Sequence, residues 1–548
     1  MTAVIEINMG EKTMKKRLLT LMMTAVLALS AVACTSVGTG NETVTDGTET
    51  TEAAETFGDA TQETVEIDEG NSGSSDKILR TAASFSYASL DVHKEYYGWY
   101  TSIYGVSETL FKMDENMNAV PLLAEDAVAD GSVWTITLKD GVAFSNGNPL
   151  TADMAVRNLQ RLAEVNERFA YLADFEMTAV DDRTFSVDTG DVYPTLRNEL
   201  ASPEFGMMDL DATTDFDNDP ICTGPFVISK FQPEGDVEVV RNENYWGGDV
   251  KLAGAVFYYM QEDDPKLLAM QSGEIDCYNS VSSAALAVYE QEPDKYNVVS
   301  IPGARLQFYI LNENTLDDAV REAINLTVDK DKIAEYLSGT VSPAVGPFNT
   351  NAAYGKVTVP AVDTAKAKEI LEADGYTLGS DGIYEKNGEK LSINIKYYAA
   401  RSLDTIAILI QEQLKEVGID SVLGVEEDPD ATYIATGDFD LALYCMIADK
   451  AGDPLYFIES TLMEGAVLNC GGFEDAHCEE LIEELKFETD AAKRADLANE
   501  IVQTAIDDNA FGYVGLFNST TVLRPGVTGF AENIPFDFYG IDADTSIE

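Results

Sequence analysis

The sequence has few of the residues that build common catalytic and metal centres. It has only two histidines, His93 and His477, and none of its six cysteines forms a C-x-x-C pair. A zinc ribbon and a thioredoxin-type redox motif are therefore excluded. A G-x-S-x-G turn, an H-E-x-x-H helix and a Walker phosphate loop are also absent. We expect no enzyme, no metal site and no cofactor; because catalytic groups can lie far apart in sequence, a secreted hydrolase is the distant alternative.

Basic residues are scarce as well. The chain has 36 lysines and arginines against 96 acidic residues, a formal net charge of -60. Such a charge repels phosphate backbones, so a nucleic acid partner is excluded. The 548 residues are 45% hydrophobic, and a single core stops growing beyond roughly 250 to 300 residues. We therefore expect at least two lobes.

The N-terminus carries an export signal. Lys15, Lys16 and Arg17 precede an apolar run over residues 18–32, which is too short for a dependable membrane span. Residues 1–33 are therefore predicted to be a signal peptide. Residues 34–76 are mostly threonine, glutamate, glycine and serine, a composition that predicts a disordered acidic tether.

Cys34 follows the small residues Ala31, Val32 and Ala33. This pattern resembles the lipobox of bacterial lipoproteins, although leucine is usual at the position of Ala31. The resemblance implies that Cys34 is lipidated and anchors the protein to the cell membrane. In the alternative interpretation the segment is an ordinary secretory signal, and Cys34 is incidental.

Two smaller features suggest no special site. Cys470 and Cys478 could form a disulfide, but scattered buried thiols are the favoured interpretation. The aspartates over residues 209–219 lack the glycine and the closing glutamate of a calcium loop, so we expect a solvated acidic loop there.

The most informative stretch covers residues 121–162. Trp134, Ile136 and Leu138 alternate with threonines, the period of a half-buried strand. Turn residues follow at 139–141 and 146–147. After Thr151, a predicted N-cap, apolar residues fall at helical spacing: Ala155, Leu159, Leu162 and Ala163. The order is strand, tight turns, then an amphipathic helix.

This order, together with CTGPFVISKF from Cys222, VVRNENYWGG from Val239 and LLAMQSGEID from Leu267, resembles the extracytoplasmic solute-binding proteins of family 5, which serve peptide and nickel ABC importers. The resemblance extends from Lys77 to the C-terminus. It implies an α/β fold with two lobes, periplasmic-binding-protein-like (type II, cluster C), with an extra subdomain in the first lobe.

The resemblance also implies the domain boundaries. Lobe I spans residues 77–303 and contains the extra subdomain at about 112–215. Lobe II spans residues 304–516, and residues 517–548 return to lobe I.

The sequence of the second lobe predicts alternating strands and helices. A helix is expected over 364–373, and another over 403–417 that ends at Gly418. Strand alternation falls between these helices and again after the second one: Leu391, Ile393 and Ile395, then Phe439, Leu441 and Leu443. This order is typical of an α/β lobe.

The resemblance implies that the protein captures a solute by hinge closure and delivers it to a membrane permease. We expect a short peptide as the ligand, with a nickel or other metal chelate as the alternative. In peptide-binding members an aspartate before Gly-Asp-Pro pairs with the peptide ammonium. Asp449 matches it with one extra residue of spacing; alternatively, Asp449 only caps backbone amides in a turn.

Other ligand contacts are implied on the first lobe. Arg168 matches an arginine of nickel-chelate-binding members, and Tyr171 stands in place of their tryptophan. A guanidinium there would suit a carboxylate, or it is an exposed arginine at a helix end. Trp99 and Tyr100 could line the pocket, although their helical spacing favours the core.

Overall fold

The computed structural model describes residues 77–233, 235–531 and 535–548. The predicted signal peptide, the tether and Cys34 lie outside the described residues. The chain divides into two units, residues 1–71 and 72–548, and the fold below is that of the second unit. Within the described residues, no helix combines the length and the apolar character that a membrane crossing requires.

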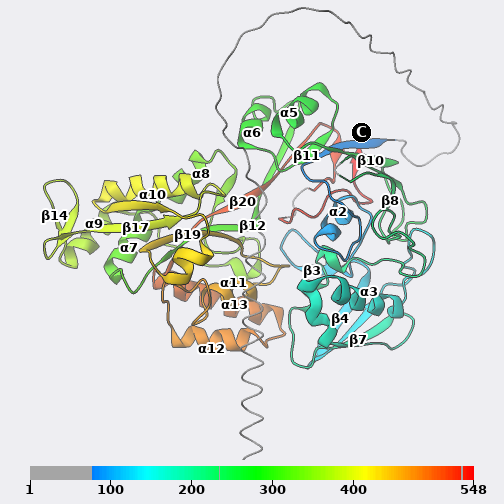
Figure 1. The fold of residues 1–548 in the computed structure, drawn as a ribbon, viewed down its shortest axis with the longest axis horizontal. Coiled ribbons are helices and arrows are strands. Elements are labelled where there is room, and N and C mark those ends of the chain that lie inside the picture. The colour runs from blue at the N-terminus through cyan, green and yellow to red at the C-terminus, as the bar shows by residue number, and fades with distance from the viewer. Residues whose placement is uncertain (1–76, 234, 532–534) are drawn as a thin grey trace, which may run out of the picture. The chain divides into compact units, whose positions relative to one another are not determined.

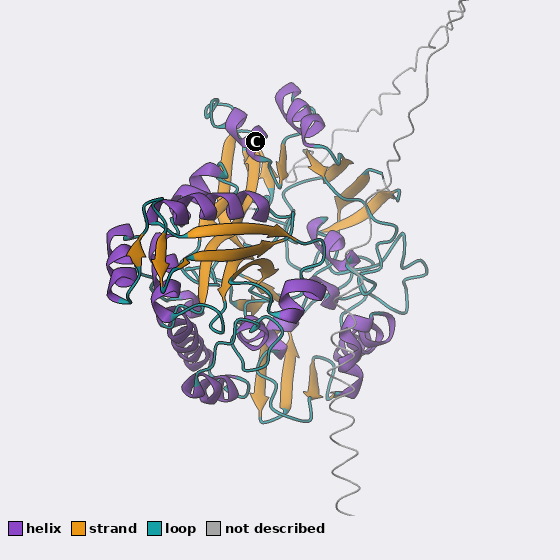
Figure 2. Ribbon diagram, turned by 60° about the vertical axis from the view of Figure 1, so that its left-hand side comes forward, coloured by secondary structure: helices purple, strands orange, loops and turns teal. Residues whose placement is uncertain are grey.

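One eleven-stranded sheet runs through the described chain (Figures 1 and 2). Its order is β18-β17-β19-β12-β20-β11-β1-β10-β9-β8, and β13 pairs with β20. The strands not named below are β1 (Ile78–Ala83), β8 (Phe226–Phe231), β9 (Val237–Arg241), β10 (Gly254–Tyr259), β11 (Cys277–Asn279), β13 (Val341–Pro343) and β18 (Asp420–Val425).

Two long strands at the centre join the halves of this sheet. They are β12 (Asn297–Leu311) and β20 (Phe511–Leu523), which pair with each other in antiparallel register. The register shifts between Pro302 and Leu306, so the predicted lobe boundary at residues 303 and 304 falls at an irregularity of β12. On one side β20 pairs with β11, and on the other β12 pairs with β19 (Leu441–Ile447).

The predicted strand, turns and helix over residues 121–162 are confirmed. β5 (Val133–Leu138) is central in a four-stranded antiparallel sheet, and α3 (Ala152–Val165) follows it. Thr151 caps the helix, because its hydroxyl accepts a hydrogen bond from the Met154 amide at 3.2 Å. The other strands of this sheet are β4 (Ala124–Asp130), β6 (Glu176–Ala179) and β7 (Thr184–Asp188).

The second half of the large sheet carries helices on both faces. The side chains of α10 (Leu403–Val417) form one core with α7 (Asp318–Thr327) and α9 (Thr364–Ala373). Those of α11 (Leu455–Thr461), α12 (Ala476–Leu485) and α13 (Ala491–Asp507) belong to another core. The predicted helices over 364–373 and 403–417 are confirmed, as are the strands β17 (Ser392–Tyr397) and β19.

The remaining elements are short. The helices are α2 (Tyr97–Ile103), α4 (Leu196–Glu199), α5 (Asp263–Ser272), α6 (Ser283–Tyr289) and α8 (Lys330–Tyr336), with 3-10 turns η1 (Glu167–Asp174), η2 (Pro203–Phe205), η3 (Ala353–Gly355) and a π-helical turn η4 (Asp430–Ile434). The strands are β2 (Phe111–Met113), β3 (Ala119–Pro121), β14 (Thr377–Leu378), β15 (Tyr384–Lys386), β16 (Glu389–Lys390), β21 (Val527–Thr528) and β22 (Ser546–Ile547).

The two smaller expectations have different outcomes. Cys470 and Cys478 are thiols and form no disulfide, as the favoured interpretation predicted. The expectation of a wholly solvated acidic loop is wrong at its first residue, since Asp209 is 2% exposed. Its carboxylate accepts hydrogen bonds from the side-chain amides of Asn146 and Asn148, each at 2.9 Å. Asp209 therefore stabilises the turn at residues 146–148, which lies about 60 residues earlier in the sequence.

Candidate functional site

A crevice is expected at the carboxyl ends of β17 and β19. These two strands are parallel neighbours. β17 leads into α10 on one face of the sheet, whereas β19 leads into α11 on the other. In open α/β sheets ligands bind at the carboxyl ends of strands, where successive connections leave toward opposite faces. The loops after β17 and β19, residues 398–402 and 448–454, therefore define the candidate site.

The loop after β19 contacts the predicted extra subdomain. Asn198 of α4 donates hydrogen bonds from its side-chain amide to the carbonyl oxygens of Ala451 and Gly452, each at 2.9 Å. Gly452 has φ +71°, and a Cβ there would collide with the Met113 side chain and the Met117 carbonyl. Only glycine fits this close approach. The candidate site therefore lies where the two halves of the described chain meet.

Asp449 is buried in this loop, with 1% of its surface exposed. Its carboxylate accepts hydrogen bonds from the Tyr354 hydroxyl and from the Gly452 amide, the latter at 2.7 Å. Burial raises the pKa of Asp449 to about 7, and the charge of Asp453 acts in the same direction. Asp453 forms an ion pair with Arg494, whose Nη2 lies 2.6 Å from Asp453 Oδ2. Among the described residues, no lysine, arginine or histidine forms an ion pair with Asp449.

Tyr171 contacts a second acidic group near this loop, the half-buried Glu199. Its hydroxyl donates to Glu199 at 2.5 Å, and the Tyr193 hydroxyl donates to the other oxygen at 2.6 Å. Burial raises the pKa of Glu199, while these hydrogen bonds and the charge of Lys450 oppose the shift. Lys450 belongs to the loop after β19, so charges from both halves of the chain interact here.

Arg168 is held by its own half of the chain. Its guanidinium donates to the Glu204 carboxylate at 3.0 Å and to the Glu95 carbonyl at 3.2 Å. It also stacks over the Tyr96 ring, 4.0 Å from the centroid. A third of the side chain, 33%, stays exposed. Arg168 is thus fixed in position with part of its surface open.

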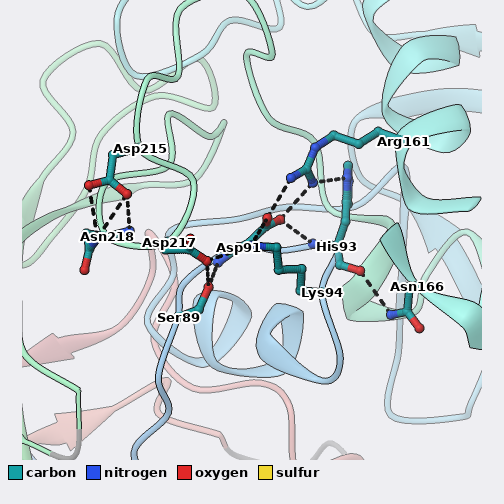
Figure 3. A network of polar contacts seen from close by, with 9 residues as sticks. All are labelled: Ser89, Asp91, His93, Lys94, Arg161, Asn166, Asp215, Asp217 and Asn218. Carbon is teal, nitrogen blue, oxygen red and sulfur yellow. Dashed lines mark hydrogen bonds and ion pairs between the residues drawn. The ribbon is translucent and has the colours of Figure 1, made fainter. Parts of the chain in front are cut away.

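A buried polar network around Asp91 and His93 includes Asn166 (Figure 3), whose side-chain oxygen accepts a hydrogen bond from the Arg168 amide. Arg161 contacts both oxygens of Asp91, at 2.8 and 2.6 Å, and lies 3.0 Å from His93 Nδ1. Burial lowers the pKa of His93 to about 4, so the ring is neutral near pH 7. Because arginine can only donate, Nδ1 accepts and Nε2–H donates to the Gly206 carbonyl. Asn166 links the network to the segment that carries Arg168 by donating to the His93 carbonyl at 3.0 Å.

Trp99 and Tyr100 pack among aromatic rings. The Trp99 ring makes an edge contact with Phe538 at 5.4 Å between centroids. The Tyr100 hydroxyl donates to the Tyr87 hydroxyl at 2.5 Å, and their rings lie 3.9 Å apart. Both side chains are half-buried against the core. These contacts join α2 to the segment after β1 and to the C-terminal segment.

Sequence reasoning missed several groups that the fold brings to this region: Tyr354, Asn198, Glu199, Arg305 and Arg401. Arg401 could have been found, because it follows a predicted strand at the carboxyl end where α/β proteins bind ligands. The other four come from distant parts of the chain and carry no local motif.

A cavity of about 710 Å³ lies elsewhere in the second half. Its lining includes Asn312 and Gly437, next to the start of β19. It is therefore at the opposite end of that strand from Asp449. Within the described residues, no group of three or more histidine, cysteine, aspartate or glutamate side chains is arranged to hold a metal ion.

Two long strands shared by two halves of the chain, which also touch at the loop after β19, are typical of proteins that hold a solute between two lobes. The family model of bacterial extracellular solute-binding proteins, family 5 (middle region), matches residues 118–467. The chain belongs to this family, whose members are solute-binding transport proteins rather than enzymes.

Known relatives agree with this assignment. The nickel-binding protein NikA of Staphylococcus aureus is 24% identical over 451 residues, which cover 81% of this chain and 89% of NikA. The oligopeptide-binding protein AppA of Bacillus subtilis is 22% identical over 575 residues, covering 96% and 99% of the two chains. The crystal structure of a nickel ABC transporter protein from Bacillus halodurans superposes with a TM-score of 0.81 at 26% identity, covering 86% of this chain and all of that one. The expected two-lobed α/β fold is confirmed.

Proposed function

We propose that this protein captures a short peptide between its lobes and presents it to the permease of an ABC importer. The mechanism needs no chemical step, because a ligand that contacts both lobes favours the closed state over the open one. The hydrogen bonds from Asn198 to the loop after β19 support this proposal, because contacts of this kind would stabilise a closed state.

Asp449 is the residue that favours a peptide as the ligand. A buried carboxylate is costly without a cation, and it becomes favourable when an ammonium group pairs with it. The α-ammonium group of a peptide would supply that charge beside Tyr354. AppA, which binds oligopeptides by name, matches this chain over nearly its full length. Arg168, Tyr171, Trp99 and Tyr100 are the further side chains that we propose to contact the ligand from the first lobe.

A nickel or other metal chelate is the second candidate. The partly exposed guanidinium of Arg168 favours it, since a planar fork suits the carboxylates of a chelator. NikA, a nickel-binding protein by name, is also among the relatives. In this alternative the metal arrives inside its chelator as part of the ligand.

Calorimetric titration distinguishes the two candidates. We expect trialanine to bind the wild-type protein, and we expect Asp449→Asn to weaken it by roughly 30-fold or more, because a buried charge loses its partner. Asp140→Asn, on a side chain that is 94% exposed, is the matched control. Unchanged trialanine binding by Asp449→Asn would remove the ammonium site. Binding of nickel citrate or nickel histidine without any peptide binding would establish the chelate instead.

We also propose that Cys34 carries a lipid that anchors the protein outside the cell membrane. The support is the sequence from Lys15 to Cys34 and the membership of an extracellular family. Cells fed labelled palmitate should label the wild-type protein and not Cys34→Ser. Labelling of both proteins, or of neither, would contradict the anchor.

A further inference from the structure

The large sheet has two edge strands, β18 and β8, and they differ in how they are protected. Lys230 lies on β8, and the register between β8 and β9 shifts between Ile228 and Lys230. A lysine and an irregular register both discourage a further strand from adding to an edge. The sequence of β18 is DSVLGV, without lysine or proline, and its six residues pair in unbroken parallel register with β17. β18 therefore presents a regular edge without this protection.

Backbone groups of β18 point away from the sheet at this edge. The Glu426 amide donates to the Tyr397 carbonyl of β17 at 2.8 Å. Backbone groups reverse direction at each residue along a strand, so those of Leu423 and Val425 point away from β17. Within the described residues, the amides and carbonyls of Leu423 and Val425 have no hydrogen-bond partner. They are free to pair with a further strand.

Apolar side chains are exposed along the same strand. Val422 and Val425 are each 57% exposed. The Gln411 side chain donates to the Ser421 carbonyl at 2.9 Å, so it covers the first carbonyl that points outward. Pairing with another strand is thus open from Leu423 onward, beside two exposed valines.

A pocket at the start of β18 has room for a side chain of a partner. Its volume is about 300 Å³, and it is lined by Gln411, Glu412, Lys415, Asp420 and Ser421. The lining has two acidic residues and one basic residue, so its net charge is negative. A lysine or arginine side chain suits such a pocket.

Both ends of the edge carry acidic groups. Asp420 begins the strand, and Glu427 and Asp428 follow it closely. Within the part of the chain that the structure describes, none of these three forms an ion pair. Glu426, by contrast, pairs with Lys396 at 2.9 Å. Basic residues at the two ends of a partner strand would neutralise the unpaired charges.

We propose that β18 is a docking edge for an extended segment of another protein, with alternating β-branched residues at its centre and lysine or arginine at its ends. Its main chain pairs with Leu423 and Val425, its side chains cover the exposed valines, and its basic ends meet the acidic groups. A second copy of this chain fits less well. Antiparallel pairing of two β18 strands would bring Asp420 of each copy beside the acidic residues that follow the other strand. The edge faces away from β17, so its occupation does not involve a solute in the crevice.

Three synthetic peptides probe the edge on the whole protein. KKTVTVTVKK has the proposed chemistry, and EETVTVTVEE reverses its charges. KKTVPVTVKK keeps the charges, but its proline removes a backbone donor and opposes strand pairing. Amide hydrogen exchange, followed by mass spectrometry, reports which segment each peptide protects. We expect only KKTVTVTVKK to slow exchange over residues 420–425, with no change over residues 226–231 of β8.

Calorimetric titration with KKTVTVTVKK measures the contributions of the edge. Val425→Lys gives β18 the kind of protection that Lys230 gives β8, so it should weaken binding roughly tenfold or more. Asp428→Asn should weaken binding roughly twofold to fivefold, and less so in high salt. Val240→Lys is the matched control, because Val240 is 44% exposed but lies on β9, which is paired on both sides. It should bind as the wild type does.

Each contrary outcome is distinct. Equal protection by KKTVPVTVKK would mean that charge alone attracts the peptide, and protection by EETVTVTVEE would mean that the acidic ends play no part. Either result contradicts the docking edge, as does the absence of binding by KKTVTVTVKK. Slower exchange over residues 420–425 at higher protein concentration without peptide would assign the edge to a second copy of the chain instead. None of these results bears on solute capture, which the titrations with trialanine and nickel chelates test separately.

Discussion

Asp449, Glu199 and Glu108 are carboxyl groups whose charged form is disfavoured by burial, and the three are satisfied differently. Asp449 accepts one hydrogen bond from the Tyr354 hydroxyl and one from the Gly452 amide, whereas Glu199 and Glu108 each accept from two aromatic donors. For Glu108 these are the Tyr245 hydroxyl at 2.7 Å and the Trp246 ring nitrogen at 2.9 Å, and burial still raises its pKa to about 7. Tyr245 and Trp246 thus hold a half-buried carboxyl group in this fold, a role that no spacing in the sequence reveals.

Asp449→Asn tests the cost of the buried charge. With a folded pKa of about 7 against an ordinary value of 3.8, the folded state binds more protons than the unfolded state between these values. Stability therefore falls as pH rises through this window, by up to about 4 kcal/mol above pH 7. We expect the stability of the unliganded Asp449→Asn variant to lack this fall with rising pH.

Denaturant unfolding at pH 5 and pH 8 gives the comparison. The raised pKa values of Glu108 and Glu313 are present in both proteins and cancel in the difference. An identical change in stability between the two pH values for wild type and variant would show that Asp449 does not titrate in this range.

At the scale of single elements, the residues at the ends of α3 and α10 stabilise those helices and fix where they begin and end. Thr151→Ala should destabilise the described unit by about 1 kcal/mol, because the Met154 amide loses its cap. Thr151→Ser keeps the hydroxyl and should cost little. Equal losses for the two variants, measured by denaturant unfolding, would contradict a capping role.

Gly418 ends α10 with φ +91°, and a Cβ there would lie 2.9 Å from the Tyr384 ring and 3.0 Å from the Gly382 carbonyl. Gly418→Ala should therefore lower the free energy of unfolding by about 1–3 kcal/mol, because alanine disfavours the left-handed backbone and its Cβ is crowded. Gly382→Ala is the control, with φ +84° and open space around its Cβ. It should cost less, and an equal loss would mean that crowding contributes nothing.

These helix ends also explain how much the sequence could predict. α10 starts and ends at the predicted residues, because Leu403 begins its apolar spacing and Gly418 terminates it. β12 runs for 15 residues, far beyond its local pattern, since its length is set by pairing with β19 and β20. In the site, Asp449 and Arg168 have local motifs, whereas Tyr354, Asn198 and Arg305 gain their places only through tertiary contacts.

At the scale of the whole molecule, the contact between α4 and the loop after β19 should bias the equilibrium between open and closed states. Asn198→Ala removes two hydrogen bonds across the lobes. We expect roughly tenfold weaker ligand binding and a larger radius of gyration for the unliganded protein in X-ray scattering.

Asn244→Ala is the control for this variant. Its side-chain amide donates to the Ser145 carbonyl at 2.9 Å, and both residues lie in the predicted first lobe, so this variant should change neither quantity. If Asn198→Ala has the scattering profile and the affinity of the wild type, these hydrogen bonds do not hold the lobes together.

The position of β20 has a consequence for biogenesis. This strand lies between β12 and β11 in the large sheet, yet residues 511–523 come after every other strand of that sheet in the sequence. Until they arrive, β11 and β12 each keep an open edge, and the two halves of the sheet have no common strand pair. The large sheet of a newly made chain can therefore close only after all of its other strands have been synthesised.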